Sequence, residues 1–279
     1  MDNIITTERI DAYCLSLLAD ERAAGTISKY RHDLTAFAHW LDGRAVTKET
    51  AAGWKNYLSH CGYAPRTVNS MLAAVNGFCR FAGLPIKLKF LSIQRQIFRD
   101  SAKELTKEEY DRLLTAARES GQERLALIME TLCATGIRIS ELRYITVEAA
   151  KDGRATISLK GKIRTILLPT KLYRKLTKYA KKEKIASGAI FRTKSGKPIS
   201  RRQVWYELKR LCQAAGVEPG KVFPHNLRHL FATTFYRACK DIARLADVLG
   251  HSSIETTRIY LAVSGAEQAR QLDKLGLVS

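Results

Sequence analysis

The spacing of apolar residues changes its period only once along the chain, and this limits the folds open to it. Apolar side chains recur every three or four residues, the spacing of a helix with one buried face, in segments 6–19, 28–41, 47–58 and 67–82. Short β-like runs, divided by Lys-Asp-Gly and Lys-Gly-Lys turns, occur only between residues 144 and 169. The sequence therefore predicts a mainly α protein, in which an N-terminal helical bundle precedes a mixed α+β part with a small three-stranded antiparallel sheet.

A basic segment separates these two parts. Residues 86–104 follow Leu-Pro, carry five basic side chains and show no helical face, which predicts an extended linker able to lie along a polyanion. We expect an N-terminal domain over residues 1–88, a linker over 89–104 and a C-terminal domain over 105–279. In the latter, Thr106 and Glu109 have the spacing of a capping box. The helices that we expect after it cover 123–135, 171–184, 200–215, 225–236, 242–249, 253–261 and 267–275.

The net charge points to a polyanionic partner. The chain has 47 Lys and Arg against 27 Asp and Glu, a formal charge of +20. Residues 1–98 hold 12 basic and 8 acidic residues, and residues 99–279 hold 35 and 19. Such a surplus fits nucleic acid or an acidic membrane surface. The longest stretch without Asp, Glu, Lys or Arg, residues 67–79, is too short to cross a bilayer.

The N-terminal sequence and the cysteines both favour the cytoplasm. The N-terminus is acidic and polar and does not have the pattern of a secretory signal. The six cysteines contain no Cys-x-x-Cys pair, so we expect reduced, mostly buried thiols and no cysteine zinc site. We therefore expect a cytoplasmic, nucleoid-associated protein with no membrane partner.

Three separate segments hold residue types that suit phosphodiester chemistry. They read Ala-Thr-Gly-Ile-Arg-Ile-Ser-Glu-Leu from residue 134, Phe-Pro-His-Asn-Leu-Arg-His from residue 223, and Leu-Gly-His-Ser-Ser-Ile-Glu-Thr-Thr-Arg-Ile-Tyr from residue 249. Breaking a phosphodiester needs a nucleophile, cationic support for the phosphate oxygens and a proton for the leaving oxygen. Arginine holds a phosphate through two parallel N–H groups, and histidine moves protons near neutral pH.

Together and in this order, the three segments resemble the tyrosine recombinase (phage integrase) family, in its simple two-domain, Xer-like form. The resemblance covers nearly the whole chain, because segments near residues 26–30 and 66–69 look like the family's N-terminal SAM-like core-binding domain. It implies that the C-terminal domain is catalytic. The catalytic residues that it implies are Arg138, Lys160, His225, Arg228, His251 and the nucleophile Tyr260, with Glu141 and His229 in supporting roles.

The resemblance also implies the reaction and its partners. The enzyme would cleave and rejoin double-stranded DNA at specific sites through a 3′-phosphotyrosyl link and a Holliday junction, with no metal, ATP or other cofactor. Four protomers would act on two sites and exchange C-terminal tails, and a second recombinase or an accessory protein could take part. The DNA-binding candidates are Lys29, Arg66, Thr67, Asn69, Lys162, Arg201, Arg202 and Gln203.

Several alternatives stay open at this stage. A type IB topoisomerase-like enzyme shares a similar catalytic set, and a relative without catalysis would only bind DNA. Lys162 competes with Lys160 as the lysine of the turn. The spacing of His225 and His229 allows a zinc pair, although Arg228 between them would repel a cation. The basic helix expected over 171–184 either contacts DNA or faces solvent, and the tail docks either on a neighbour or on its own core.

Overall fold

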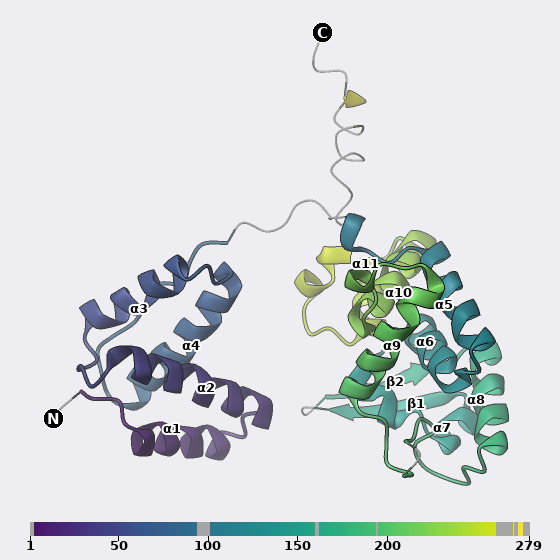
Figure 1. Cartoon of the computed structure of the whole chain (residues 1–279), viewed down its shortest axis with the longest axis horizontal. Coiled ribbons are helices and arrows are strands. Elements are labelled where there is room, and N and C mark those ends of the chain that lie inside the picture. Colours follow the sequence, from purple (N-terminus) through teal and green to yellow (C-terminus); the bar gives the residue numbers. More distant parts are fainter. Residues whose placement is uncertain are drawn as a thin grey trace. The chain divides into compact units, whose positions relative to one another are not determined.

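The chain divides into two compact units, Met1–Arg95 and Gln96–Ser279, which are described separately (Figure 1). The computed structural model describes residues 3–93, 101–159, 162–193 and 195–260, together with 270 and 273–275. Among these residues, no helix has the length and apolar character needed to span a membrane.

The first unit is a bundle of helices that share one apolar core. Its helices are α1 (Thr7–Ala19), α2 (Ala24–Leu41), α3 (Lys48–His60) and α4 (Pro65–Phe81), close to the predicted segments. Threonine side chains cap α1 and α3, and a proline occupies the first turn of α4, as helix starts prefer. The largest fully buried side chains of this core are Leu34, Phe37, Leu41, Leu58, Leu72 and Phe78.

The segment after α4 is bonded to the first unit. The Asn76 side chain accepts from Leu88 N and donates to Leu88 O, and Asn69 pairs in the same way with Leu91. Lys55 donates to Lys89 O. The first residues of the predicted linker are therefore held against the bundle, while its residues 94–100 lie outside the described part of the chain.

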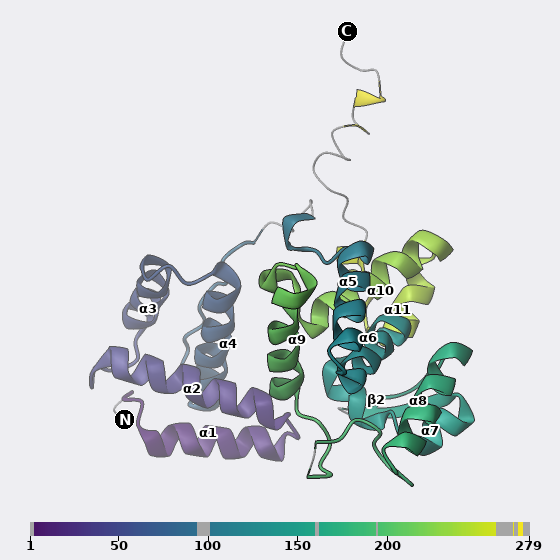
Figure 2. The ribbon, with the colours of Figure 1, turned by 45° about the vertical axis from the view of Figure 1, so that its right-hand side comes forward.

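The second unit is built around α6 (Glu123–Thr135), an apolar helix that contacts α5, α8, α9 and α10. The other helices are α5 (Lys107–Glu119), α7 (Val147–Asp152), α8 (Thr170–Lys182), α9 (Arg201–Ala215), α10 (Pro224–Cys239) and α11 (Ile242–Leu249). Short 3-10 turns are η1 (Ser101–Lys103), η2 (Ile139–Tyr144), η3 (Pro219–Lys221), η4 (Ile254–Thr256) and η5 (Arg258–Tyr260). Figures 1 and 2 show α8 and α9 on opposite sides of α6.

The prediction of a three-stranded sheet was wrong for the described residues, which form one antiparallel pair. Strands β1 (Arg154–Leu159) and β2 (Lys162–Leu167) pair from Arg154 with Leu167 to Leu159 with Lys162. The expected first strand, near residue 146, instead starts α7. Thr146 makes a single bridge to Ala189, and its hydroxyl caps α7 by accepting from Ala149 N. A β-branched residue therefore caps a helix here. Strand propensity alone does not distinguish a residue in this role from one within a strand.

The last part of the chain also departs from the predicted helices. Residues 253–261 were expected to form one helix, but the described residues form the two turns η4 and η5. Ser253 caps the first turn, and Thr257 separates it from the second. The expected helix over 267–275 falls largely outside the described residues.

Candidate active site

Arg138 follows the C-terminal end of α6, and Glu141 binds both its backbone N–H and its guanidinium. Gly136 ends α6 with φ of +62°, and a Cβ there would lie 2.3 Å from Phe231 Cδ1, so only glycine fits this turn. Glu141, 2% exposed in its side chain, accepts from Arg138 N at 2.7 Å and from Arg138 Nη1 at 3.2 Å. The Arg138 side chain keeps 42% of its surface exposed, so its guanidinium is both oriented and accessible to an anion.

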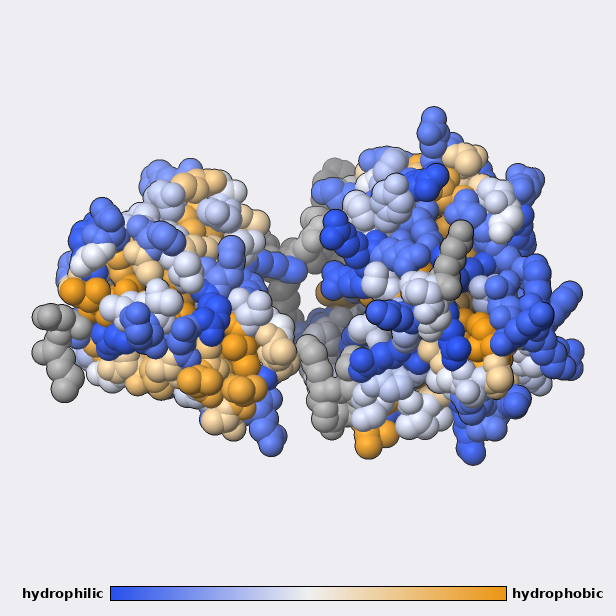
Figure 3. Space-filling view, turned by 60° about the horizontal axis from the view of Figure 1, so that its bottom comes forward, coloured by the Kyte–Doolittle hydropathy of each residue, from blue (hydrophilic) through white to orange (hydrophobic). Residues whose placement is uncertain are grey.

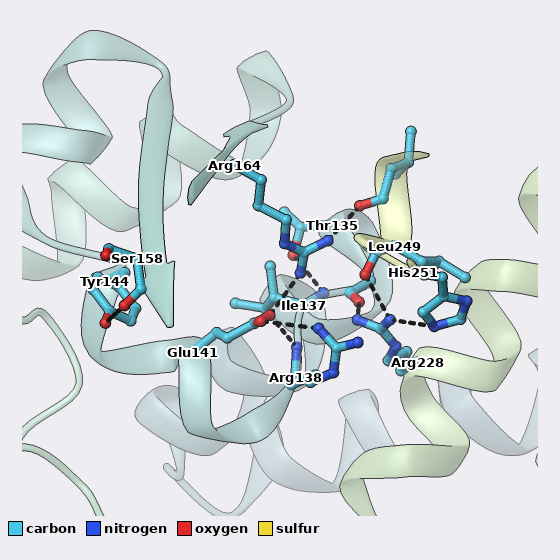
Figure 4. A network of polar contacts seen from close by, with 12 residues as sticks. Thr135, Ile137, Arg138, Glu141, Tyr144, Ser158, Arg164, Arg228, Leu249 and His251 are labelled. Atoms are coloured by element: carbon cyan, nitrogen blue, oxygen red, sulfur yellow. Dashed lines mark hydrogen bonds and ion pairs between the residues drawn. The ribbon is translucent and has the colours of Figure 1, made fainter. Parts of the chain in front are cut away.

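Arg228, on α10, lies buried among carbonyl groups from the other two segments. Its guanidinium donates to Gly136 O, to Leu249 O at 2.8 Å and to His251 Nε2 at 3.0 Å (Figure 4). The Tyr260 hydroxyl is a further hydrogen-bond partner. Burial, followed by the nearby charge of Arg138, lowers the pKa of Arg228 to about 10, and Tyr260 opposes this shift. The arginine thus remains charged at neutral pH while it joins all three segments.

His251 is neutral in this arrangement. Arginine can only donate, so His251 Nε2 accepts from Arg228, and the ring proton resides on Nδ1, 2.8 Å from the hydroxyl oxygen of buried Thr257. Burial first, and then the charges of Arg228, Arg138 and Arg164, lowers the pKa of His251 to about 4. A neutral imidazole can accept a proton.

Tyr260 belongs to the same cluster of residues. It is 2% exposed and packs with Ala232, Leu245 and Leu249. Its ring centroid is 5.0 Å from that of His229 and 6.2 Å from that of His251, and the His251 ring is nearly parallel to it. The phenol of Tyr260 is thereby brought beside the Arg228 guanidinium.

The other two candidate site histidines, His225 and His229, lie on successive turns of α10. His225 is exposed on the first turn, where partial loss of hydration, followed by the charges of Arg228 and Arg138, lowers its pKa. His229 Nε2 lies 3.8 Å from Glu104 Oε1. No group of three His, Cys, Asp or Glu residues able to hold a metal occurs in the part of the chain that the structure describes.

The lysine turn lies at the tip of the β1–β2 hairpin. Lys160 and Gly161 are outside the described residues, and Lys162 starts β2.

The predicted DNA-binding residues lie on several elements. Arg201 and Arg202 are exposed on the first turn of α9, and Gln203 donates to Glu207 at 3.1 Å. In the first unit, Arg66 and Thr67 are exposed at the start of α4, and Lys29 pairs with buried Asp33 at 2.6 Å. The side-chain amide of Asn69 donates to Leu91 O and accepts from Leu91 N. Figure 3 shows hydrophilic side chains over most of the visible face of the second unit.

Sequence reasoning missed two residues that bind the site residues, Arg164 and Thr257. Arg164 donates to Glu141 Oε2 at 2.7 Å and to Val248 O at 2.7 Å, and Thr257 is the partner of His251 described above. Arg164 had a detectable signal, because it alternates with Ile166 and Leu168 and so falls on the inward face of its strand. Thr257 had none, since its role depends on the fold of the turns around it.

Two family models match the chain. The model described as the phage integrase family covers residues 103–267, and the one described as the phage integrase N-terminal SAM-like domain covers residues 10–83.

Similar proteins span nearly the same length. The chain is 30% identical over 281 residues to a protein named tyrosine recombinase XerA from Thermococcus kodakarensis, covering 96% of this chain and 97% of that protein. It is 32% identical over 272 residues to tyrosine recombinase XerD of Xanthomonas campestris pv. campestris, covering 87% and 83%.

Solved structures share the fold. A lambda integrase tetramer bound to a Holliday junction superposes with a TM-score of 0.73 at 22% identity, covering 93% of this chain and 78% of that one. A XerH site-specific recombinase bound to its difH substrate before cleavage gives a TM-score of 0.69 at 18% identity, with coverage of 95% and 84%.

Proposed function

The chain belongs to the phage integrase family of tyrosine recombinases, and from this premise we propose how its own residues cut and rejoin DNA. As a member, it is a site-specific recombinase, a DNA strand transferase that works through a Holliday junction. One observation supports the assignment of its residues: a tyrosine, two arginines and a histidine from three distant segments lie together in one cluster.

Tyr260 is the proposed nucleophile. Its phenolic oxygen attacks the scissile phosphorus, the bond from phosphorus to the 5′ oxygen breaks, and a 3′-phosphotyrosyl link and a free 5′-hydroxyl result. The link conserves the energy of the broken bond, so attack by a 5′-hydroxyl of the partner strand rejoins DNA without ATP. Arg228, which already contacts the phenol, lies close enough to stabilise the negative charge on it.

Arg138 and Arg228 would hold the non-bridging oxygens of the phosphate. Arg138 is exposed and oriented by Glu141, and Arg228 would exchange part of its carbonyl contacts for phosphate oxygens. His251 is neutral at pH 7, so it can receive the proton of Tyr260 when Arg228 turns to the phosphate. His225, on the exposed first turn of α10, would donate to a phosphate oxygen, and His229, which packs beside the Tyr260 ring, would support the nucleophile.

The proton for the departing 5′ oxygen is assigned to Lys160 on the family resemblance alone. Residues 1–88 would serve as the core-binding domain, 89–104 as linker and 105–279 as catalytic domain. Arg201, Arg202 and Gln203 would enter the major groove from the start of α9, and Lys29, Arg66, Thr67 and Asn69 would contact DNA from the first unit. Four protomers on two sites, joined by exchanged tails, would complete the assembly.

The test uses a DNA site found by the protein itself. A Tyr260→Phe variant selects duplexes from a random-sequence pool, and the selected duplex is then prepared with a nick at each successive position. Parent protein should form a covalent adduct with one or two of these nicked duplexes, seen on a denaturing gel, and EDTA should not change its yield.

The matched control is Tyr236→Phe, since Tyr236 packs against the same small apolar cluster as Tyr260. Tyr260→Phe should abolish the adduct and keep DNA affinity, whereas Tyr236→Phe should keep both. An adduct that persists in Tyr260→Phe would refute the nucleophile assignment. A type IB topoisomerase activity is not favoured, because the N-terminal SAM-like model matches the first unit.

A further inference from the structure

Arg164 makes contacts that the cleavage chemistry does not require of it. It lies on β2, in the strand that follows the hairpin tip, with a side chain 15% exposed. Its Nη2 donates to Glu141 Oε2 and its Nη1 to Val248 O, both at 2.7 Å (Figure 4). One planar guanidinium therefore joins a buried carboxylate to a backbone carbonyl far away in sequence.

Each of the two groups that Arg164 binds belongs to, or adjoins, a residue that accepts a hydrogen bond from Arg138 or Arg228. Glu141 Oε2, which accepts from Arg164, also accepts from Arg138 N at 2.7 Å. Val248 directly precedes Leu249, whose carbonyl accepts from Arg228 at 2.8 Å. A shift of Arg164 would therefore move the supports of Arg138 and Arg228 together.

The glycine before His251 keeps this arrangement possible. A Cβ on Gly250 would lie 2.6 Å from both Cδ and Nη1 of Arg164, and Gly250 has φ of +63°. Glycine thus serves two needs at this position, the left-handed backbone and the passage of the Arg164 side chain. This steric relation is independent of the hydrogen bonds.

Strand β1 of the same hairpin is also hydrogen-bonded to η2. The Tyr144 hydroxyl donates to Ser158 O on β1, while Arg164 binds Glu141 from β2. Tyr144 and Glu141 both belong to η2, the turn that follows Arg138. The hairpin and the Arg138 segment are therefore joined at two points.

We propose that Arg164 is a positioning residue for DNA cleavage: it locks Glu141, and through it Arg138, to the turn that carries His251 and supports Arg228. The inference rests on the proposed function above. Arg164 does not contact the phosphate. It fixes the distance between the two guanidinium groups that do, and small errors in such a distance can cost about 100-fold in rate.

The experiment measures single-turnover covalent adduct formation at saturating protein, on the selected nicked duplex. Arg164→Met should slow the step by about 100-fold. Arg164→Lys should slow it less, by about tenfold, because an ammonium can retain one of the two contacts. The control Arg112→Met removes a guanidinium that also binds two carbonyls, those of Ala215 and Gly216, and should leave the rate unchanged.

A second substrate separates positioning from a general structural defect. In a duplex with a methylphosphonate at the mapped scissile position, the phosphate charge that the arginines neutralise is absent. If Arg164 acts through them, the ratio of parent to Arg164→Met rates should fall from about 100 to about 10 or less. An equal ratio on both substrates would show a structural role only and overturn the proposal.

If Arg164→Met fails to fold, Arg164→Lys carries the rate test, and the glycine supplies a second, steric test of the same contact. Gly250→Ala should slow adduct formation, and in the double variant with Arg164→Ala the combined loss should be smaller than the product of the two single losses. A full product would overturn the steric link between the two residues. No adduct with parent protein would refute the proposed function, whereas a fully active Arg164→Met would refute this inference alone.

Discussion

Replacing Gly136 by alanine tests why the Arg138 segment begins with a glycine. Gly136 has φ of +62°, a Cβ on it would lie 2.3 and 2.5 Å from two ring carbons of Phe231, and its carbonyl accepts from Arg228. The substitution should therefore destabilise the second unit and disturb the active site in a single step.

Comparison with Gly216 gives the size of the expected loss in the free energy of unfolding. Gly216 ends α9 with φ of +59° and has nothing within 4 Å of an added Cβ. Gly216→Ala should therefore cost only the left-handed strain, about 1–2 kcal/mol. Gly136→Ala carries the same strain and adds overpacking against Phe231, about 1–3 kcal/mol more. The difference between the two variants isolates the clash.

Urea unfolding followed by circular dichroism gives the two free energies, provided that the slope of the transition stays constant. Combining Gly136→Ala with Phe231→Leu should recover part of the lost stability, because the ring that meets the Cβ is gone. If Gly136→Ala and Gly216→Ala have the same free energy of unfolding within about 0.5 kcal/mol, the packing argument is refuted. Adduct formation should fall in Gly136→Ala and stay at the parent rate in Gly216→Ala.

Three further outcomes are expected. Glu141→Gln should reduce the free energy of unfolding by roughly 1–3 kcal/mol and slow adduct formation, since a buried partner of two arginines loses its charge; unchanged stability would contradict the network. The pKa of His251, about 4 in the folded protein, lies below its usual value, so stability should be lost as pH falls from about 6.5 toward 4, and His251→Gln should lose less in urea titrations at pH 7 and 5. In the Arg201→Gln, Arg202→Gln double variant, the slope of log affinity against log salt should fall by about 2, while the single exposed control Arg118→Gln should not change it.

Local sequence signals predicted most of the helices because their causes are local. Thr47 and Thr106 cap their helices through side-chain bonds within three residues, and Glu123–Thr135 is apolar enough to be buried whatever surrounds it. The errors arose where a side chain caps an element that local propensity did not predict. Thr146 looked like part of a strand and caps α7, whereas Ser253 caps a short 3-10 turn in place of the start of a full helix.

The residue types of the candidate site could also be read from the sequence, because phosphate chemistry restricts which side chains can serve and three motifs hold such side chains at characteristic spacings. How these residues support one another could not be read. Arg164 touches Glu141 across 23 positions and Val248 across 84, and periodicity within a strand indicates only that it faces inward.

Propensity, capping and side-chain reactivity act over a few residues, so local patterns predicted most element types, the boundaries of most helices and the kind of chemistry. The fold, by contrast, brings Arg228 to Gly136 O and His251 at once, sets Tyr260 beside it, and leaves room at Gly250 for Arg164. These contacts depend on the packing of α6, α10 and the β1–β2 hairpin, and no local pattern encodes the distance between segments that lie far apart in the chain.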